Sequence, residues 1–252
     1  MFEVIFLSIV QGITEFLPIS SSAHIILFSK YFSFNNENLT LDISLHLGSL
    51  LAILIYFKKD LLDFTKNKNF FFKILISSVP VMLCGYFLIK YGLIYIFRSY
   101  EMIGWSTVLF ALLLYFSDTI KIKKIYRKDF SYSAAIFMGF FQVLSLMPGV
   151  SRSGITITAA RLLNFSREDS AKISFLISIP VLITVSLYNL QNLMINKNIE
   201  VSLLNFYGVC FSFFFSYITI KFFLEFIKKF TFLPFVIYRV ILGLFILAHV
   251  YY

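Results

Sequence analysis

Long apolar stretches, separated by short polar connections, run through the whole chain. Six of them are long enough, or nearly so, to cross the hydrocarbon core of a bilayer, which takes about 20 residues of helix. We expect membrane-spanning helices at residues 41–57, 70–89, 102–120, 173–195, 201–223 and 232–252. The pattern therefore predicts an all-α polytopic membrane protein with six spanning helices.

Two further apolar stretches are too short to cross. Residues 2–17 and 133–147 are each followed at once by Pro and then by Ser-rich sequence. A second short apolar stretch comes behind each of them, at 23–28 and at 155–163. A short apolar segment, a polar break and another short apolar segment are typical of a re-entrant hairpin. We expect two re-entrant helical hairpins beside the six spans.

The basic residues are concentrated in alternate connections. Residues 58–73 hold five Lys, residues 121–128 hold five Lys or Arg, and residues 221–229 hold three Lys. Connections rich in Lys and Arg stay on the cytoplasmic side of a membrane. With that assignment all six spans alternate consistently, and the two hairpins enter the membrane from opposite sides, the first from the outer side.

Opposite insertion suggests an internal repeat. When Ser20 is set against Ser151, Gln11 falls on Gln142 and Ser22 on Ser153 without a gap. Few identities support this alignment, but together with the charge pattern it favours an inverted-topology repeat. We expect a single integral membrane domain of residues 1–252, with repeats at 1–120 and 121–252. In such folds the site lies near the middle of the bilayer, where the broken segments meet.

Composition agrees with a membrane protein and excludes other classes. Hydrophobic residues make up 59% of the chain and charged residues 14%, whereas a soluble domain is about one quarter charged. The net charge of +9 lies mainly in the connections, so nucleic acid is not an expected partner. Cys84 and Cys210 stand alone in apolar stretches, which indicates neither a disulfide nor a metal site.

The first interruption, residues 11–24, carries ionisable groups inside an apolar segment. Gln11 and Glu15 are four residues apart and share one face of a helix, which Pro18 then ends. Ser20, Ser21 and Ser22 can cap the next helix and leave His24 near its first turn. Serines alone are often packing contacts between membrane helices. A Glu and a His so close together in such a segment indicate function.

The second interruption is suited to an anion. Gly149 and Gly154 flank a turn that holds Ser151, Arg152 and Ser153. Backbone N–H groups and hydroxyls at the start of a helix form an anion-binding site, and the guanidinium fork matches phosphate oxygens. The alternative is an Arg that only anchors a helix end at the interface. Its Ser and Gly neighbours favour the phosphate role.

Together the two interruptions supply the parts for phosphoryl transfer, which is mainly positioning and charge neutralisation. Ser and His can provide a nucleophile and its base, or the His can protonate the leaving oxygen. Glu15 can activate that pair or hold a divalent cation, Mg or Ca, although one carboxylate does not make a metal cage. Asp42 and His46 share a helical face and either line the site or pair at the water interface.

The chain resembles the bacterial undecaprenyl-pyrophosphate phosphatase family, the bacitracin-resistance proteins. The resemblance rests on QGITEFLPISSSAH at 11–24 and PGVSRSG at 148–154, and it is supported by the segment 42–49 and the run FLPFVIYR at 232–239. It covers essentially the whole chain. It implies a hydrolase that converts the C55 prenyl diphosphate to its monophosphate, so that the lipid carrier of peptidoglycan is recycled and bacitracin is resisted.

By position, the resemblance gives each motif residue a role. Glu15 matches the acidic motif, Ser21 the nucleophile, His24 an acid, base or alternative nucleophile, and Arg152 the phosphate-binding Arg. Gln11 stands where many members have Glu, which weakens a metal role shared by two carboxylates.

The resemblance further implies a polyprenyl diphosphate substrate, a place in the bacterial cytoplasmic membrane with a site that opens toward the periplasm, and a homodimer as an assembly to be tested. The alternative is a polyprenyl-phosphate flippase or transporter, because inverted repeats with broken helices are common among transporters. A flippase needs the phosphate cradle but not the group formed by Ser21, His24 and Glu15.

Overall fold

The computed structural model describes residues 2–21, 23–24, 27–28, 39–195 and 203–252, and in these residues it has no named β-strand. The helices follow the order α1 (Phe2–Thr14), α3 (Leu39–Tyr56), α4 (Lys58–Lys66), α5 (Lys68–Lys90), η1 (Leu93–Arg98), α6 (Tyr100–Asp118), α7 (Tyr126–Asp129), α8 (Tyr132–Val143), η2 (Leu144–Leu146), α9 (Arg152–Leu162), α10 (Arg167–Ile195), α11 (Leu203–Lys229) and α12 (Leu233–Tyr251). The predicted all-α class is confirmed.

Five of the described helices are long and apolar enough to cross a membrane, namely α5, α6, α10 as far as Tyr188, α11 and α12. They occupy five of the six predicted spans, so the chain is a polytopic membrane protein. The sixth predicted span is α3, whose apolar part, Ile43–Tyr56, is shorter. The helix α1 and the segment Tyr132–Leu146 are also short, in agreement with the interrupted pattern of the sequence.

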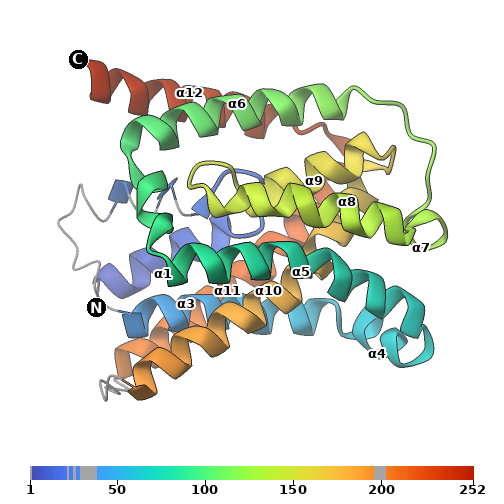
Figure 1. Ribbon diagram of the computed structural model, residues 1–252, viewed down its shortest axis with the longest axis horizontal. Helices are drawn as coiled ribbons and strands as arrows, with labels where there is room; N and C mark the ends of the chain where they lie inside the picture. The colour runs from blue at the N-terminus through green and yellow to red at the C-terminus, as the bar shows by residue number, and fades with distance from the viewer. Residues whose placement is uncertain (1, 22, 25–26, 29–38, 196–202) are drawn as a thin grey trace.

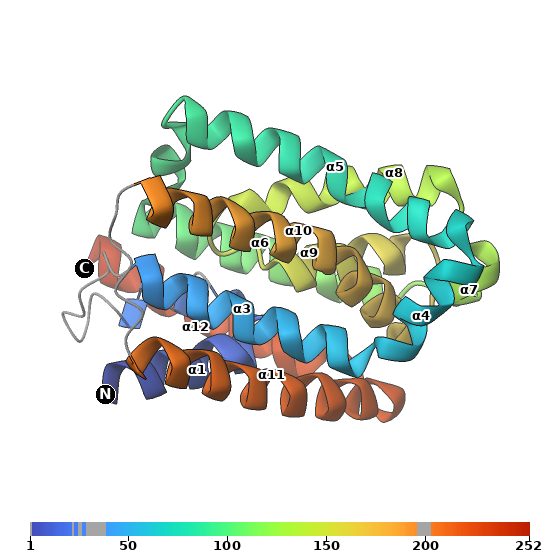
Figure 2. The same cartoon turned by 90° about the horizontal axis from the view of Figure 1, so that it is seen from below.

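The two short segments enter the bundle from opposite ends. In Figure 1, α1 starts beside the N-terminus, whereas α8 starts beside α7 at the other end, and α9 returns toward that end. The Lys-rich segments share one end: Figure 2 places α4, α7 and the last turn of α11 together, away from both chain termini. The basic connections therefore lie on one side of the bundle, as the charge pattern predicts.

Small residues let α11 approach α3 closely. A Cβ atom on Gly48 of α3 would lie 2.5 Å from the carbonyl oxygen of Val209. One residue further on, the Ser49 hydroxyl lies 3.2 Å from that of Ser212 and 3.0 Å from that of Ser216. Membrane helices associate through such small-residue packing and hydroxyl hydrogen bonds, since lipid tails provide no hydrophobic drive.

The pair α6 and α12 is held by a reciprocal glycine contact. A Cβ on Gly104 would lie 2.7 Å from Cγ of Leu247, and one on Gly243 would lie 2.5 Å from Cγ2 of Val108. Only glycine therefore permits this separation of the two helices. The close contact sets the position of α12, whose first half reaches the centre of the molecule.

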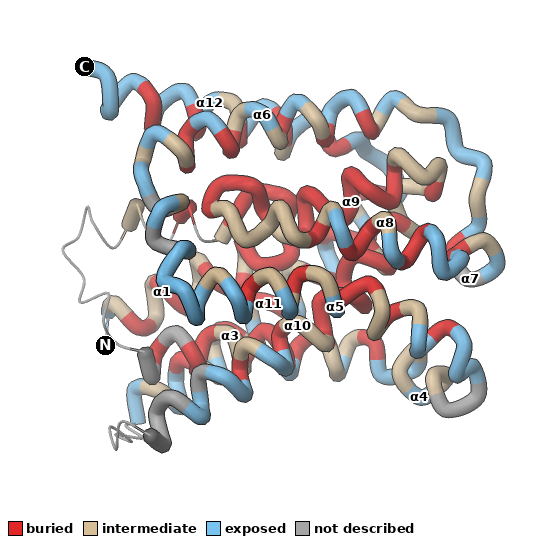
Figure 3. Tube along the Cα trace, in the orientation of Figure 1, coloured by how far each residue is buried: buried red, intermediate tan, exposed pale blue. Residues whose placement is uncertain are grey.

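The centre of the molecule is its most buried part, and the hairpin tips end there (Figure 3). Phe16, which follows Glu15 directly, is fully buried, and its ring meets that of Phe175 edge-on at 5.4 Å. Aromatic pairs of this geometry add about 0.5–1.5 kcal/mol beyond their buried area. This contact fixes the first hairpin tip against α10.

At the basic end of the bundle, Asp118 ties four helices together. Its carbonyl oxygen accepts from Nη2 of Arg161 at 3.0 Å, and its Oδ1 accepts from Nε of Arg167 at 2.7 Å. Its Oδ2 accepts from the backbone N–H of Phe232 at 3.2 Å. The last residue of α6 is thus joined to α9, α10 and the start of α12, so the second hairpin is anchored at its base.

Candidate functional site

The two hairpin tips meet at an ion pair between residues 137 positions apart. Nη2 of Arg152, the first residue of α9, donates to Oε1 of Glu15 at 2.8 Å. The side chains are only 13% and 7% exposed, respectively. A buried charge is tolerated when it is paired and hydrogen-bonded. Each hairpin thus compensates the charge that the other brings into the apolar interior.

The second carboxylate oxygen of Glu15 is held by the first hairpin itself. Nε2 of Gln11 donates to Oε2 at 3.0 Å, as the spacing of four residues predicts. The hydroxyl of Ser21 donates to the same oxygen at 3.1 Å. Glu15 therefore accepts hydrogen bonds from both hairpins, and the hydroxyl of Ser21 lies within proton-transfer distance of a carboxylate.

The turn before α9 caps the N-terminus of that helix. Ser151 caps α9, with its hydroxyl accepting from the N–H of Gly154 at 3.1 Å. Ser151 has φ 69° and Ser20, its partner in the repeat alignment, has φ 73°. Non-glycine residues rarely adopt positive φ, and such strain occurs mostly at functional sites. Both hairpins therefore make the same unusual turn at aligned positions.

Arg152 keeps one donor group unused. Within the described part of the chain, Nη1 of Arg152 is buried and has no hydrogen-bond partner. It belongs to a side chain that sits at the N-terminal end of an eleven-residue helix, where the helix dipole favours an anion. Because an unpaired buried donor is costly, Nη1 is suited to an anionic acceptor.

Ser153 connects the two tips rather than lying open. Its hydroxyl donates to the carbonyl oxygen of Leu17 at 2.7 Å and lies 3.2 Å from the hydroxyl of Ser151. Packing also requires glycine at position 149, because a Cβ there would collide with Ser106 and Ile103 of α6. For these two of the predicted binding residues, the structure shows contacts that hold the tips in place.

His24 lies near the site with both ring nitrogens engaged. Its Nδ1 is 2.7 Å from the carbonyl oxygen of Ser20, and its Nε2 is 2.5 Å from the hydroxyl of Tyr238 on α12. The residue is 5% exposed. In this arrangement Ser21 donates to Glu15, and His24 bonds to groups other than Ser21. The structure thus shows Ser21 hydrogen-bonded to Glu15, and the pairing of a Ser with a His stays a prediction.

Arg239 holds both hairpin tips and was missed by the sequence reasoning. Its Nη2 donates to the carbonyl oxygens of Gly149 and Val150, each at 3.0 Å, and its Nη1 to that of Pro18 at 3.5 Å. The residue is fully buried. A cation inside an apolar span is itself a functional signal. The sequence carries that signal at the end of the run 232–239.

The remaining predicted residues are placed as follows. Ser22 and the side chain of Asp42 lie outside the described residues. Asp42 and His46 both belong to α3, and His46 lies close enough to Glu15 for their charges to interact. That His46 lines the site stays a prediction.

The donor set does not fit a dedicated metal site. Among the described residues, no three His, Cys, Asp or Glu side chains gather where they could hold a metal ion. Gln11 brings an amide N–H, not a second carboxylate, to Glu15, and Arg152 brings a positive charge. A divalent cation, Mg or Ca, held by Glu15 stays a prediction.

The fold and the site define a polytopic membrane protein with a charged centre made by two opposed hairpin tips. The family model described as Bacitracin resistance protein BacA matches residues 4–245. Among curated relatives, an undecaprenyl-diphosphatase of Pelagibacter ubique is 45% identical, covering 99% of this chain and 97% of that protein. Undecaprenyl-diphosphatases of Saccharophagus degradans and Alteromonas mediterranea are 38% and 37% identical, over 99% and 100% of this chain and 98% and 99% of those proteins.

These matches span nearly the whole chain, so it belongs to the BacA bacitracin resistance family. The family resemblance predicted from the motifs at 11–24 and 148–154 is confirmed.

Proposed function

We propose that this protein is an undecaprenyl-diphosphatase, which hydrolyses undecaprenyl diphosphate to undecaprenyl phosphate and phosphate. Recycling of the lipid carrier for peptidoglycan, and with it resistance to bacitracin, follows from that activity. Family membership and the function of the named relatives support the reaction. The observation that carries it is the hydrogen-bonded group of Glu15, Ser21 and Arg152, with one buried guanidinium donor unused.

Arg152 and the start of α9 receive the terminal phosphate. Nη1 of Arg152 donates to a phosphate oxygen while Nη2 keeps its hydrogen bond to Glu15. The N-terminal N–H groups of α9 face the same anion. Charge that builds up on the phosphoryl oxygens is thus stabilised by groups already in place, which is the main requirement of phosphoryl transfer.

Ser21 is the nucleophile that the geometry favours. As its Oγ bonds to the terminal phosphorus, Oε2 of Glu15 takes the hydroxyl proton across 3.1 Å. The bond from phosphorus to the bridging oxygen breaks, and undecaprenyl phosphate leaves with that electron pair. Water then attacks the phosphoserine, phosphate leaves, and the proton returns from Glu15 to Ser21. His24 is less suited to attack, since Tyr238 holds its Nε2.

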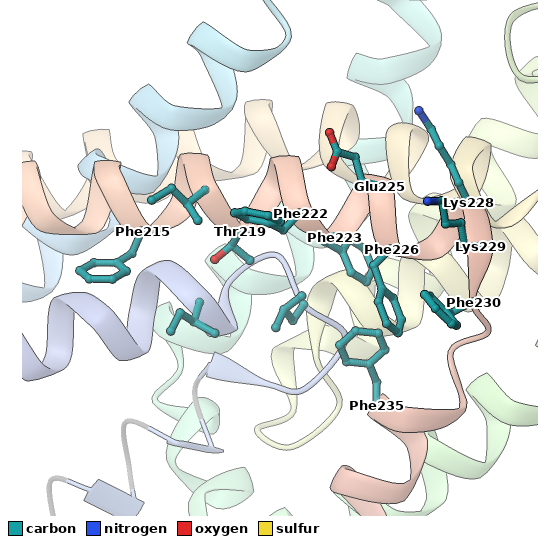
Figure 4. Close-up of a pocket in the computed structure, with 13 residues that line it drawn as sticks. Phe215, Thr219, Phe222, Phe223, Glu225, Phe226, Lys228, Lys229, Phe230 and Phe235 are labelled. Carbon is teal, nitrogen blue, oxygen red and sulfur yellow. The ribbon is translucent and has the colours of Figure 1, made fainter.

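An apolar groove beside the first hairpin is suited to the prenyl chain. It has a volume of about 820 Å³ and lies between Ile13 and Leu17 of the hairpin and the aromatic face of α11 (Figure 4). At one end, the ring of Phe226 lies 4.8 Å from that of Phe230 and 5.7 Å from that of Phe235. Leu17, which lines the groove, also accepts the hydrogen bond of Ser153, so the groove adjoins the contact between the two tips.

The proposed location is the bacterial cytoplasmic membrane, with the site open toward the periplasmic face. The gathering of α4, α7 and the end of α11 at one end of the bundle supports this orientation (Figure 2). Because Lys-rich connections stay in the cytoplasm, the first hairpin then enters from the periplasmic side. A homodimer stays a prediction.

The decisive experiment measures phosphate release by the purified protein in detergent. Wild type should release phosphate from undecaprenyl diphosphate, and Arg152→Ala should abolish release while the protein still elutes as a folded species. Absence of release from any prenyl diphosphate, together with lipid translocation in vesicles, would overturn the enzyme in favour of a flippase.

A further inference from the structure

Helix α12 brings a tyrosine into direct contact with the site histidine. The hydroxyl of Tyr238 lies 2.5 Å from Nε2 of His24, across 214 positions of sequence. The two rings are nearly parallel, 5° apart, with their centroids separated by 5.7 Å. One hydrogen bond and one stacked face therefore fix both the position and the tilt of the imidazole.

The contact on the other side of the ring decides which nitrogen carries the proton. Nδ1 of His24 lies 2.7 Å from the carbonyl oxygen of Ser20, and a carbonyl can only accept a hydrogen bond. Nδ1 is therefore the protonated nitrogen of the neutral ring. Nε2 is left with its lone pair, so the hydroxyl of Tyr238 donates to it. Partners of this kind set the tautomer of a functional histidine.

We propose that Tyr238 is a positioning residue that holds His24 with its proton-accepting Nε2 directed at α12. A hydroxyl is suited to this role, because it donates to the neutral imidazole and accepts from the protonated one. The same contact thus survives when His24 gains or loses a proton. The expected effect on turnover rests on the proposed function, but the tautomer of His24 does not.

The neighbouring residue fixes Tyr238 relative to the hairpins. Arg239 donates to the carbonyl oxygens of Pro18 on the first tip and of Gly149 and Val150 on the second. The helix α12 therefore cannot shift along its axis without breaking these hydrogen bonds, and Tyr238 is held in place with it. Tyr238 is 42% exposed, whereas His24 is 5% exposed.

The first test is Tyr238→Phe, which keeps the stacked ring and removes only the hydroxyl. We expect kcat for a prenyl diphosphate to fall about 10-fold and KM to stay within about twofold, the effect of one lost hydrogen bond on an acid–base group. The matched control is Tyr251→Phe on the same helix. The hydroxyl of Tyr251 bonds to Glu101 at the exposed end of α12, so its removal should leave kcat unchanged.

The second test reads the tautomer directly and needs no activity. The chain has three histidines, so ¹⁵N-histidine labelling gives a spectrum of few signals, and a His24→Gln variant assigns those of His24. Protonated and bare imidazole nitrogens have well-separated ¹⁵N shifts. Wild type should show a protonated Nδ1 and a bare, hydrogen-bonded Nε2. In Tyr238→Phe the Nε2 signal should move, whereas in Tyr251→Phe it should not.

The two readouts separate a positioning role from simple packing. A wild-type His24 with protonated Nε2 would overturn the proposal, and so would a fall in kcat with unchanged ¹⁵N shifts in Tyr238→Phe. An unchanged kcat would equally overturn it. If wild type released no phosphate, the proposed function would fail, and the ¹⁵N spectra would still decide whether Tyr238 sets the tautomer of His24.

Discussion

Replacement of Arg152 by Lys tests whether its guanidinium binds Glu15 with one nitrogen and the phosphate with the other. In the structure Nη2 is bound to Glu15 at 2.8 Å while the buried Nη1 has no partner among the described residues. A planar fork can hold the carboxylate with one nitrogen and a phosphate with the other. Lys keeps the charge but offers all its donors from one flexible nitrogen, so it cannot hold both in the same geometry.

The size of the effect follows from one lost charge-assisted hydrogen bond. Such a bond contributes about 1.5–3 kcal/mol, and every 1.4 kcal/mol is tenfold in rate, so Arg152→Lys should lower kcat/KM about 10- to 150-fold. Arg152→Ala is a harsher change. It leaves the carboxylate of Glu15 buried and unpaired, at a cost of about 3–5 kcal/mol in stability. Arg152→Lys therefore isolates the phosphate contact better.

The assay is steady-state phosphate release from undecaprenyl diphosphate in detergent, with Arg167→Lys as the control. Arg167 also pairs with a carboxylate, through Nε at 2.7 Å from Asp118, but at the basic end of the bundle and away from the site. Its kcat/KM should stay within about twofold of wild type. The reasoning is refuted if Arg152→Lys keeps more than half of the wild-type kcat/KM, or if both variants fall equally.

Four further substitutions test other parts of the site and the groove. Ser21→Ala and His24→Ala should each lower kcat more than they raise KM, and near-normal kcat in both would contradict their roles. Gly154→Ala should lower the thermal midpoint of unfolding and the activity together, because its Cβ would lie 2.9 Å from Nη1 of Arg239. Such overpacking costs about 1–3 kcal/mol of stability. An unchanged midpoint would count against this contact. Phe226→Ser in the groove should raise KM for the C55 substrate more than for a 15-carbon prenyl diphosphate, and equal changes would remove the groove from the lipid path.

The helices could be predicted from the sequence because the bilayer imposes their length. A spanning helix needs about 20 apolar residues, so run length alone separates α5, α6, α10, α11 and α12 from the short segments. Local spacing also predicted the hydrogen bond of Gln11 with Glu15, since residues four apart share a helix face. That Arg152 reaches the same place followed from the opposite insertion of the two hairpins.

The contacts made by α12 could not be predicted in this way. The distance between Tyr238 and His24 depends on how α12 is rotated and how closely it packs on α6. Both are set by the reciprocal contacts of Gly104 and Gly243, and apolar run length contains no information about them. For the same reason the sequence left open which group contacts the hydroxyl of Ser21. Its hydrogen bond to Glu15 depends on the side-chain direction beside Ser20, whose φ is positive.

The contact between the two tips also bears on the inverted repeat, which stays a prediction. The alignment that pairs Ser20 with Ser151 pairs Ser21 with Arg152. Ser21 donates to Oε2 of Glu15 and Arg152 to Oε1, so these aligned residues meet at one carboxylate. Residues related by a twofold axis approach each other closely only near that axis. The predicted repeat would therefore place its pseudo-twofold axis beside Glu15, where the aligned Ser21 and Arg152 meet.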